Sequence, residues 1–87
     1  MPTLTLYTRR DCRLCDEMKT VVRAVAATLP LTCKDVDVDG DPRLAQAYGR
    51  DVPVLLADGR EIARHRVTAA RLRQLLAETG GAGHQGT

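Results

Sequence analysis

The spacing of apolar residues changes along this chain between a strand period and a helix period. Thr3 to Tyr7 is a short run rich in β-branched and aromatic residues, which predicts a central strand. A helical period follows and predicts a helix from about Cys12 to Thr28 that ends before Pro30. One apolar stripe of this helix carries Leu14, Met18, Val21, Val22, Val25 and Leu29. The stripe indicates that the helix buries one face against a sheet.

The middle of the chain predicts a second strand and a second helix. Leu31 to Val38 has alternating apolar members and predicts the strand. Asp41 and Pro42 then form a helix start signal, because a carboxylate can cap the free N–H groups and proline suits the first helical position. We expect a short helix that ends at Gly49.

The second half of the chain predicts a hairpin and a last helix. Val52 to Ala57 is a nearly continuous apolar run, as expected of a strand buried on both faces. Asp58-Gly59 is a strong signal for a two-residue hairpin turn, and Glu61 to His65 supplies the returning strand. The last helix is predicted from Thr68 to about Thr79, with Gly80 as its cap.

The resulting order, β-α-β-α-β-β-α, predicts an α/β protein. Strands joined by the long first helix must run parallel, whereas the hairpin adds antiparallel strands, so we expect a four-stranded mixed sheet with helices on both faces. The domain should span residues 1–79. Residues 80–87 have nothing to bury and are expected to form a flexible tail.

Composition narrows the class of protein. The 87 residues include no Phe or Trp, so the core of a single small domain must consist of Leu, Val and Ala. A net charge of +2, with neither a basic block nor aromatic platforms, argues against a nucleic-acid partner. No apolar run is long enough to span a bilayer and no signal-peptide pattern is present, so we expect a cytoplasmic protein without membrane contacts. We also expect a monomer.

Cys12 and Cys15 carry the candidate chemistry. A Cys-x-x-Cys pair at a strand-to-helix junction in a reducing compartment is typical of a thiol–disulfide redox centre. The spacing puts the first sulfur at the helix N-terminus and the second one turn inside, so one thiol can attack and the other can resolve. Helix N-terminal N–H groups stabilise an anion, so we expect Cys12 to be more acidic than a free cysteine. Nearby charges act both ways, with Arg9, Arg10 and Arg13 favouring the thiolate and Asp11 and Asp16 opposing it.

Other readings of these residues remain open. The two cysteines could be buried thiols, or part of a zinc site, although only Cys33, His65 and His84 could complete it, at unrelated spacings. Residues 35–40 copy the first half of a calcium loop, but Gln46 stands where that loop needs a bidentate glutamate. We expect no metal. Cys33 is interpreted as a small core residue rather than a third redox partner.

Charged residues near the fourth strand and the last helix allow one further interpretation. Five arginines gather in this part of the sequence, namely Arg60, Arg64, Arg66, Arg71 and Arg73. Such a cluster is usually a solvated face, and a docking patch for an acidic partner is the alternative. His65 lies near the end of the fourth strand and is interpreted as structural rather than as a proton shuttle.

The Cys12-x-x-Cys15 motif, the Val52-Pro53 pair and the order of elements together resemble the glutaredoxin branch of the thioredoxin fold. The resemblance is to small bacterial glutaredoxin-like proteins and covers residues 3 to about 79. It implies a thioredoxin-like fold with strand order 2-1-3-4, and a cis Pro53 beside the cysteine pair. It also implies that Cys12 is the nucleophile. A cis X-Pro bond would turn the backbone of Val52 toward the sulfurs, where it could pair with an extended substrate.

The sequence departs from that family at positions that concern glutathione. Arg13-Leu14 stands between the cysteines where glutathione-dependent members have Pro-Tyr, and Arg9 occupies the family's basic position three residues before the first cysteine. The family's Gly-Gly and Asp at the last helix align with Val67-Thr68 and Ala70-Arg71. Glutathione therefore stays open as a co-substrate. Arg9, Arg13, Leu14, Val52 and Pro53 are the candidate substrate-binding residues.

These observations predict a thiol–disulfide oxidoreductase without a bound cofactor. The expected partners are a disulfide-containing protein or a low-molecular-weight thiol, together with a reductant such as glutathione or a thioredoxin reductase. A non-catalytic thioredoxin-fold adaptor or a thiol-based metal carrier is the alternative.

Overall fold

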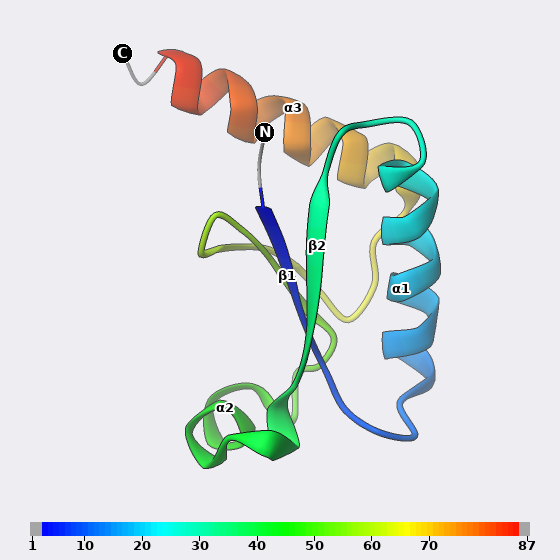
Figure 1. Cartoon of the computed structure of the whole chain (residues 1–87), viewed down its shortest axis with the longest axis vertical. Helices are drawn as coiled ribbons and strands as arrows, with labels where there is room; N and C mark the ends of the chain where they lie inside the picture. Colours follow the sequence, from blue (N-terminus) through cyan, green and yellow to red (C-terminus); the bar gives the residue numbers. More distant parts are fainter. Residues whose placement is uncertain (1–2, 86–87) are drawn as a thin grey trace.

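The computed structural model describes residues 3–85, and the side chains up to residue 78 (Figure 1). Strands and helices alternate along the chain as the apolar pattern predicts. The elements are β1 (Thr3–Thr8), α1 (Arg13–Ala26), β2 (Thr32–Asp37), the 3-10 helix η1 (Val38–Gly40), α2 (Pro42–Tyr48), β3 (Val54–Ala57), β4 (Arg60–Arg64) and α3 (Ala69–Gln85).

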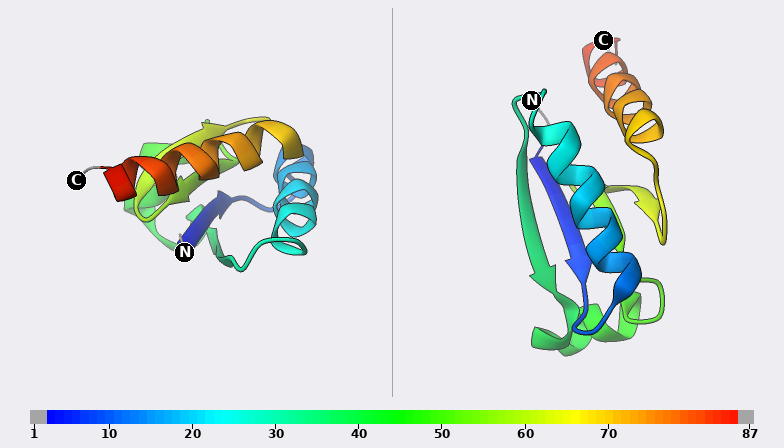
Figure 2. Two further views of the ribbon diagram at one scale, coloured as in Figure 1. Left: turned by 90° about the horizontal axis from the view of Figure 1, so that it is seen from above. Right: turned by 90° about the vertical axis from the view of Figure 1, so that its right-hand side faces the viewer.

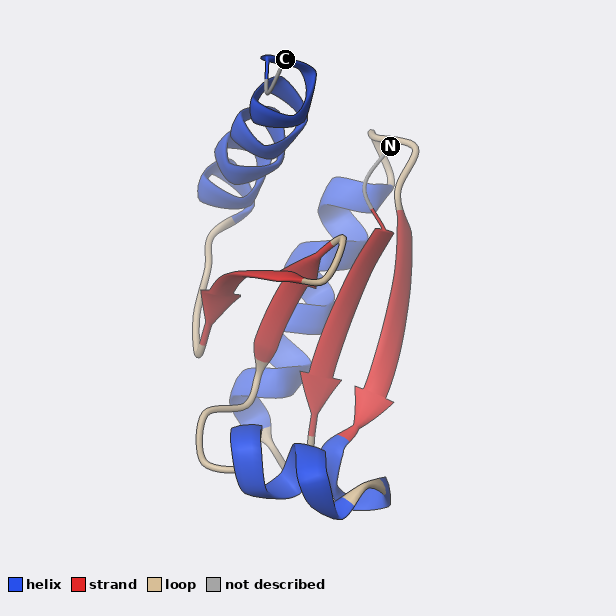
Figure 3. Ribbon diagram, turned by 90° about the vertical axis from the view of Figure 1, so that its left-hand side faces the viewer, coloured by secondary structure: helices blue, strands red, loops and turns tan. Residues whose placement is uncertain are grey.

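The four strands form one mixed sheet in the order β2-β1-β3-β4, and Figure 3 shows them side by side. β1 runs parallel to β2 and antiparallel to β3, and β3 pairs antiparallel with β4. The predicted strand order and directions are confirmed. Because β1 and β3 are neighbours and Tyr7 pairs with Val54, the chain leaves β1 at the same end of the sheet at which it enters β3.

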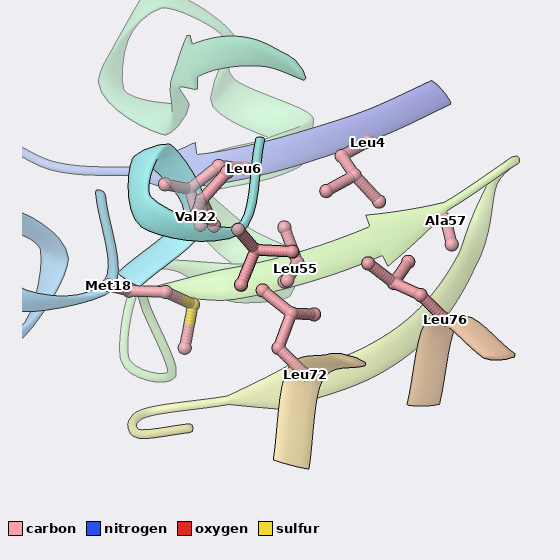
Figure 4. Packing of buried hydrophobic residues seen from close by; sticks show 9 residues of the cluster. Leu4, Leu6, Met18, Val22, Leu55, Ala57, Leu72 and Leu76 are labelled. Carbon is pink, nitrogen blue, oxygen red and sulfur yellow. The ribbon is translucent and has the colours of Figure 1, made fainter. Parts of the chain in front are cut away.

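The core lies between the sheet and the two longer helices, as Figures 2 and 4 show. Alternation along the strands turns every second side chain of β1 and β3 toward α1 and α3. Nine buried side chains form this cluster: Leu4, Leu6, Met18, Val22, Val25, Leu55, Ala57, Leu72 and Leu76. Apart from Met18, these are Leu, Val and Ala, as the composition requires.

α2 covers one end of the second face of the sheet. α2 lies below the sheet in Figure 1, and its Tyr48 ring contacts the Tyr7 ring with 4.8 Å between centroids. Tyr7 follows Leu6 in β1, so its side chain lies on the face opposite to the core. α2 buries none of its own residues completely, which fits a helix that only closes the end of this face.

The hairpin turn between β3 and β4 has the backbone that its two residues favour. Asp58 and Gly59 have φ angles of 50° and 83°, so both lie in the left-handed region typical of a type I′ turn. The Asp58 N–H donates to the Thr3 carbonyl at 2.9 Å, and the Thr3 N–H donates to Asp58 Oδ1 at 2.9 Å. The turn therefore also anchors the start of β1.

Several boundaries differ from the predicted ones. β3 begins at Val54 rather than Val52, because Pro53 has no N–H to donate to a strand ladder. The sequence also did not predict η1. α3 continues to Gln85, past the predicted end at Thr79, because glycine weakens a helix by about 1 kcal/mol without removing a hydrogen bond. The expected cap at Gly80 is therefore wrong. The flexibility of residues 80–87 stays a prediction, and residues 86–87 lie outside the described part.

Candidate functional site

Cys12 and Cys15 form a disulfide at the start of α1. Cys12 is the N-cap of the helix: its backbone is extended, with φ −112°, and its Sγ accepts a hydrogen bond from the Cys15 N–H at 3.1 Å. The preceding Asp11 has a φ of 53°, a left-handed conformation that Asp tolerates better than most residues. This turn brings the Cα atoms of the two cysteines to 5.2 Å, within the range that a disulfide needs.

The two sulfur-bearing residues differ in exposure. Cys15 is completely buried, because it lies one turn inside α1 on the side that packs against the sheet. Cys12 is partly exposed, because it lies outside the first helical turn. A molecule in solution can therefore contact Cys12, whereas Cys15 is shielded from solvent.

Val52 and Pro53 lie at the same end of the sheet as the cysteine turn, since β1 and β3 are antiparallel neighbours. Their peptide bond is cis, as the resemblance implied. The Pro53 carbonyl accepts a hydrogen bond from the His65 N–H at 2.8 Å, which extends the pairing of β3 with β4. Val52 is partly exposed, and within residues 3–85 no loop or turn hydrogen bond reaches its backbone. The polar groups of Val52 are thus free for an added strand.

Arg9 links the cysteine loop to η1 and α2. Its Nη2 and Nε atoms donate to the Asp39 carboxylate, with Nη2–Oδ1 at 2.9 Å, and its Nη1 donates to the Gly49 carbonyl at 3.0 Å. Hydrogen bonding and the opposite charge raise the pKa of Arg9 and lower the pKa of Asp39. Arg9, one of the candidate substrate-binding residues, therefore binds a carboxylate of the protein itself.

Arg13 and Leu14 stand between the two cysteines. The Arg13 side chain is 94% exposed and forms a long ion pair with Glu17, with 3.9 Å between Nε and Oε2. Leu14 is partly exposed although it belongs to the apolar stripe of α1. Both residues directly follow Cys12 in the sequence, and their part in substrate binding stays a prediction.

Asp51 connects the Val52-Pro53 loop to a charged cluster that the sequence did not reveal. Asp51 Oδ2 lies 3.2 Å from Arg64 Nη1, and Asp51 Oδ1 lies 3.5 Å from His65 Nε2. Arg64 also donates to Glu61 at 2.6 and 2.7 Å, which lowers the pKa of Glu61. In a regular strand, side chains three residues apart point to opposite faces of the sheet. The pairing of β3 with β4 is irregular between Leu55 and Leu56, and this irregularity lets Glu61 and Arg64 of β4 meet on one face.

Other residues were also missed by the sequence analysis. Asp39 was considered only within residues 35–40, the segment that copies the first half of a calcium loop, and nothing in its spacing indicates a bond to Arg9. Gly49 was predicted only to end the short second helix, yet its carbonyl also accepts a hydrogen bond from the Arg9 guanidinium. Only Asp51 could have been found from the sequence. It directly precedes Val52-Pro53, so an acidic side chain was to be expected beside the backbone that is predicted to pair with a substrate.

The prediction that Cys33 is a small core residue is wrong, because the structure shows it as an exposed free thiol. β2 is an edge strand, so among the described residues no strand pairs with its outer side. The hollow beside Cys33 is lined from α1 by Lys19, Val22, Arg23 and Ala26. Partial burial in a hollow of about 150 Å³ and the nearby Asp35 carboxylate raise the pKa of the Cys33 thiol. Cys33 pairs with Leu4 at the start of β1, at the end of the sheet away from Cys12.

Neither a metal site nor a membrane span is found among the described residues. No group of three or more His, Cys, Asp or Glu side chains among them is arranged to hold a metal ion. None of the helices within residues 3–85 combines the length and the apolar content of a membrane span.

Comparison with known proteins places the chain in a family. The sequence profile of the glutaredoxin-like domain (DUF836) matches residues 3–77. The uncharacterized protein Rv0508 of Mycobacterium tuberculosis is 31% identical over 83 residues, which cover 90% of this chain and 86% of that protein. The structure of XcR50 from X. campestris is 40% identical with a TM-score of 0.73, covering 85% of this chain and 95% of the other.

A more distant structure shares the fold. Desulfothioredoxin from Desulfovibrio vulgaris Hildenborough, in its reduced form, is 23% identical with a TM-score of 0.71, covering 88% of this chain and 80% of the other. At that identity the likeness concerns the fold alone. Together with the cysteine turn, the strand order and the matched residues 3–77, these findings show that the chain belongs to the glutaredoxin-like domain family and has a thioredoxin-like fold.

Proposed function

We propose that the protein is a thiol–disulfide oxidoreductase that works through Cys12 and Cys15. The observation that carries this proposal is the unequal exposure of the bonded pair, with Cys12 partly exposed at the helix N-terminus and Cys15 completely buried. The free N–H groups and the positive dipole end of α1 stabilise a thiolate at Cys12. Cys12 is therefore the nucleophile and Cys15 the resolving residue.

The reaction follows from this arrangement. In the reduced protein, the Cys12 thiolate attacks one sulfur of a substrate disulfide, the substrate S–S bond breaks, and the other substrate sulfur leaves as a thiolate and takes up a proton. Cys15 then gives up its thiol proton and attacks Cys12 Sγ, releasing the first substrate sulfur as a thiol. The Cys12–Cys15 bond that results is the state described here, and two electrons have passed to the substrate.

The loop at Val52 supplies the substrate-binding backbone in this proposal. Its polar groups lie beyond the end of the β3 ladder, at the end of the sheet from which the cysteine turn departs. An extended segment of a disulfide-bearing protein can add to this backbone as a strand adds to a sheet edge. Arg13 and Leu14 directly follow Cys12 in the sequence and contact the residues that flank the substrate cysteine.

The proposal is tested with two single variants and a protein disulfide such as insulin. Cys12→Ser should abolish exchange, because the attacking sulfur is lost. Cys15→Ser should accumulate a mixed disulfide between Cys12 and the substrate, seen as an added mass that a reductant removes. Cys33→Ser is the matched control and should keep the wild-type rate. Wild-type exchange rates in Cys12→Ser would contradict the proposal, and a wild type that does not exceed the uncatalysed rate would leave a non-catalytic adaptor as the function.

The electron donor is tested separately. Oxidised protein is supplied either with glutathione, glutathione reductase and NADPH or with a thioredoxin reductase and NADPH, and NADPH consumption is followed. Since Val67-Thr68 and Ala70-Arg71 stand where glutathione-dependent members have Gly-Gly and Asp, we expect faster turnover with the reductase. Turnover with glutathione alone would assign glutathione as the co-substrate instead.

A further inference from the structure

A groove of about 460 Å³ lies on the side of α1 that faces the segment between β4 and α3. Glu17 and Val21 line it from α1, and Arg66, Val67, Thr68 and Arg71 line it from the other side. Figures 1 and 2 show this segment, coloured yellow, running alongside α1. We call this hollow the α1–α3 groove. None of its residues belongs to the cysteine turn or to the Val52-Pro53 loop.

The α1–α3 groove is close to the reactive sulfur and to the substrate-pairing loop. Glu17 follows Cys12 by five residues in α1, which corresponds to about 7.5 Å along the helix axis. The other wall begins next to Pro53, because the His65 N–H is bonded to the Pro53 carbonyl and Arg66 is the next residue. At about 3.3 Å per residue, two or three residues of an extended chain reach the groove from Cys12.

The lining combines an apolar floor with positive charge. Val21 and Val67 are half-buried and supply the floor. Arg66 and Arg71 are exposed; among the described residues Arg66 forms no ion pair, and Arg71 meets Glu78 only at 3.9 Å. The single acid of the lining, Glu17, already faces Arg13 at 3.9 Å. The groove is thus complementary to an anionic segment that also carries an apolar side chain.

Of the other three arginines of the sequence cluster, Arg60 does not line the α1–α3 groove, and the remaining two bind other parts of the protein. Arg64 is held by Glu61 and Asp51, and Arg73 donates to Thr28 Oγ1 at 2.7 Å. The structure therefore selects Arg66 and Arg71 from the five as the charges that face a hollow.

We propose that the α1–α3 groove docks an acidic segment of the disulfide-bearing protein substrate, with an apolar side chain on Val21 and Val67 and carboxylates facing Arg66 and Arg71. The inference rests on the proposed oxidoreductase function and names the substrate class. The occupant is a polypeptide rather than a small thiol, because it must reach Cys12 and fill the apolar floor at the same time.

The test uses two peptides, each with one cysteine joined to 2-nitro-5-thiobenzoate, whose release is followed by absorbance. One peptide carries Leu and Glu two and three residues from the cysteine on both sides, and the other carries Leu and Lys there. At low salt the wild type should prefer the acidic peptide by about five- to tenfold in kcat/KM, with the preference falling as salt rises. Arg66→Glu/Arg71→Glu should abolish or reverse it.

The controls separate docking from chemistry and from folding. Arg43→Glu/Arg60→Glu makes the same change in net charge away from the groove and should keep the preference. Arg66→Gln/Arg71→Gln should lose it with a milder change of charge. All variants should reduce hydroxyethyl disulfide at the wild-type rate. Equal kcat/KM for the two peptides with the wild type, or an unchanged preference in Arg66→Glu/Arg71→Glu, would overturn the proposal.

A binding measurement without redox chemistry keeps the two proposals distinguishable. The Cys12→Ser/Cys15→Ser protein is titrated against both peptides with serine in place of cysteine, using fluorescence anisotropy. Tighter binding of the acidic peptide, lost on Arg66→Glu/Arg71→Glu, supports the groove even if the wild type proves unable to exchange disulfides. Exchange without such binding leaves the oxidoreductase standing and removes the groove. If N-acetyl-Leu-Glu displaces the bound acidic peptide as strongly as the unlabelled whole peptide does, the assignment of the groove to a polypeptide is overturned.

Discussion

The Arg9 guanidinium holds the Asp39 carboxylate with hydrogen bonds of 2.9 and 3.1 Å, across 30 positions of sequence. The same guanidinium reaches the Gly49 carbonyl at the end of α2. The loop that leads into the cysteine turn is thereby tied to both helical segments below the sheet. This relationship gives Arg9 a structural function in addition to any contact with a substrate.

The Arg9–Asp39 pair should make stability depend on pH. Since the pKa of Asp39 is lowered in the folded state, its contribution is complete above the unfolded pKa of about 3.9 and is lost as pH falls through the folded pKa. In a double-mutant cycle of Arg9→Gln and Asp39→Asn, urea unfolding should show a favourable coupling at pH 7 that declines below about pH 5. A coupling that is constant down to pH 3 would contradict the assigned ion pair.

Cys33 should be the one cysteine that iodoacetamide modifies in the oxidised protein, because Cys12 and Cys15 are bonded to each other. Burial of the thiol and the Asp35 charge raise the pKa of Cys33, so the rate of alkylation should reach its midpoint above the ordinary value of 9.0. Asp35→Asn should lower that midpoint only in part, because burial is the larger cause. Mass spectrometry across a pH series measures the rate, and a midpoint below 9.0 would contradict this account.

Leu72 should be essential for stability, since it is completely buried and joins α3 to the cluster on the sheet. Leu72→Ala removes apolar contacts and leaves a cavity, so it should reduce the free energy of unfolding by about 2–5 kcal/mol. Urea denaturation followed by circular dichroism gives the value. Gln74→Ala, on the exposed side of the same helix, should change it by less than about 0.5 kcal/mol.

Gly59 should be required for its backbone conformation rather than for space. A Cβ at Gly59 would meet nothing within 4 Å, but the φ of 83° lies in the left-handed region. Gly59→Ala should therefore cost about 1–2 kcal/mol of unfolding free energy, whereas Gly59→Asn should cost less. Gly40, which has the same open space without a left-handed φ, provides the control, and Gly40→Ala should be close to neutral. Equal effects at the two glycines would refute the conformational explanation.

Local signals account for most of the fold that the sequence predicted. The apolar stripe of α1, the Asp41-Pro42 start of α2 and the Asp58-Gly59 turn each act between neighbours in sequence, so the elements could be predicted from short segments. Errors occurred where distant parts decide the outcome. Cys33 was assigned to the core because its neighbours are apolar, but the strand order places β2 at the exposed edge.

The cysteine turn was also a local feature, and the sequence alone determined which sulfur is outermost, because a helix begins between Cys12 and Cys15. Only the tertiary structure decided what surrounds that turn. The bond between Arg9 and Asp39, the cluster at Asp51 and the groove beside α1 join segments that no spacing connects. The physical reason is that ion pairs and hollows depend on how strands are ordered and registered in three dimensions, whereas helix and turn signals depend on backbone geometry within a few residues.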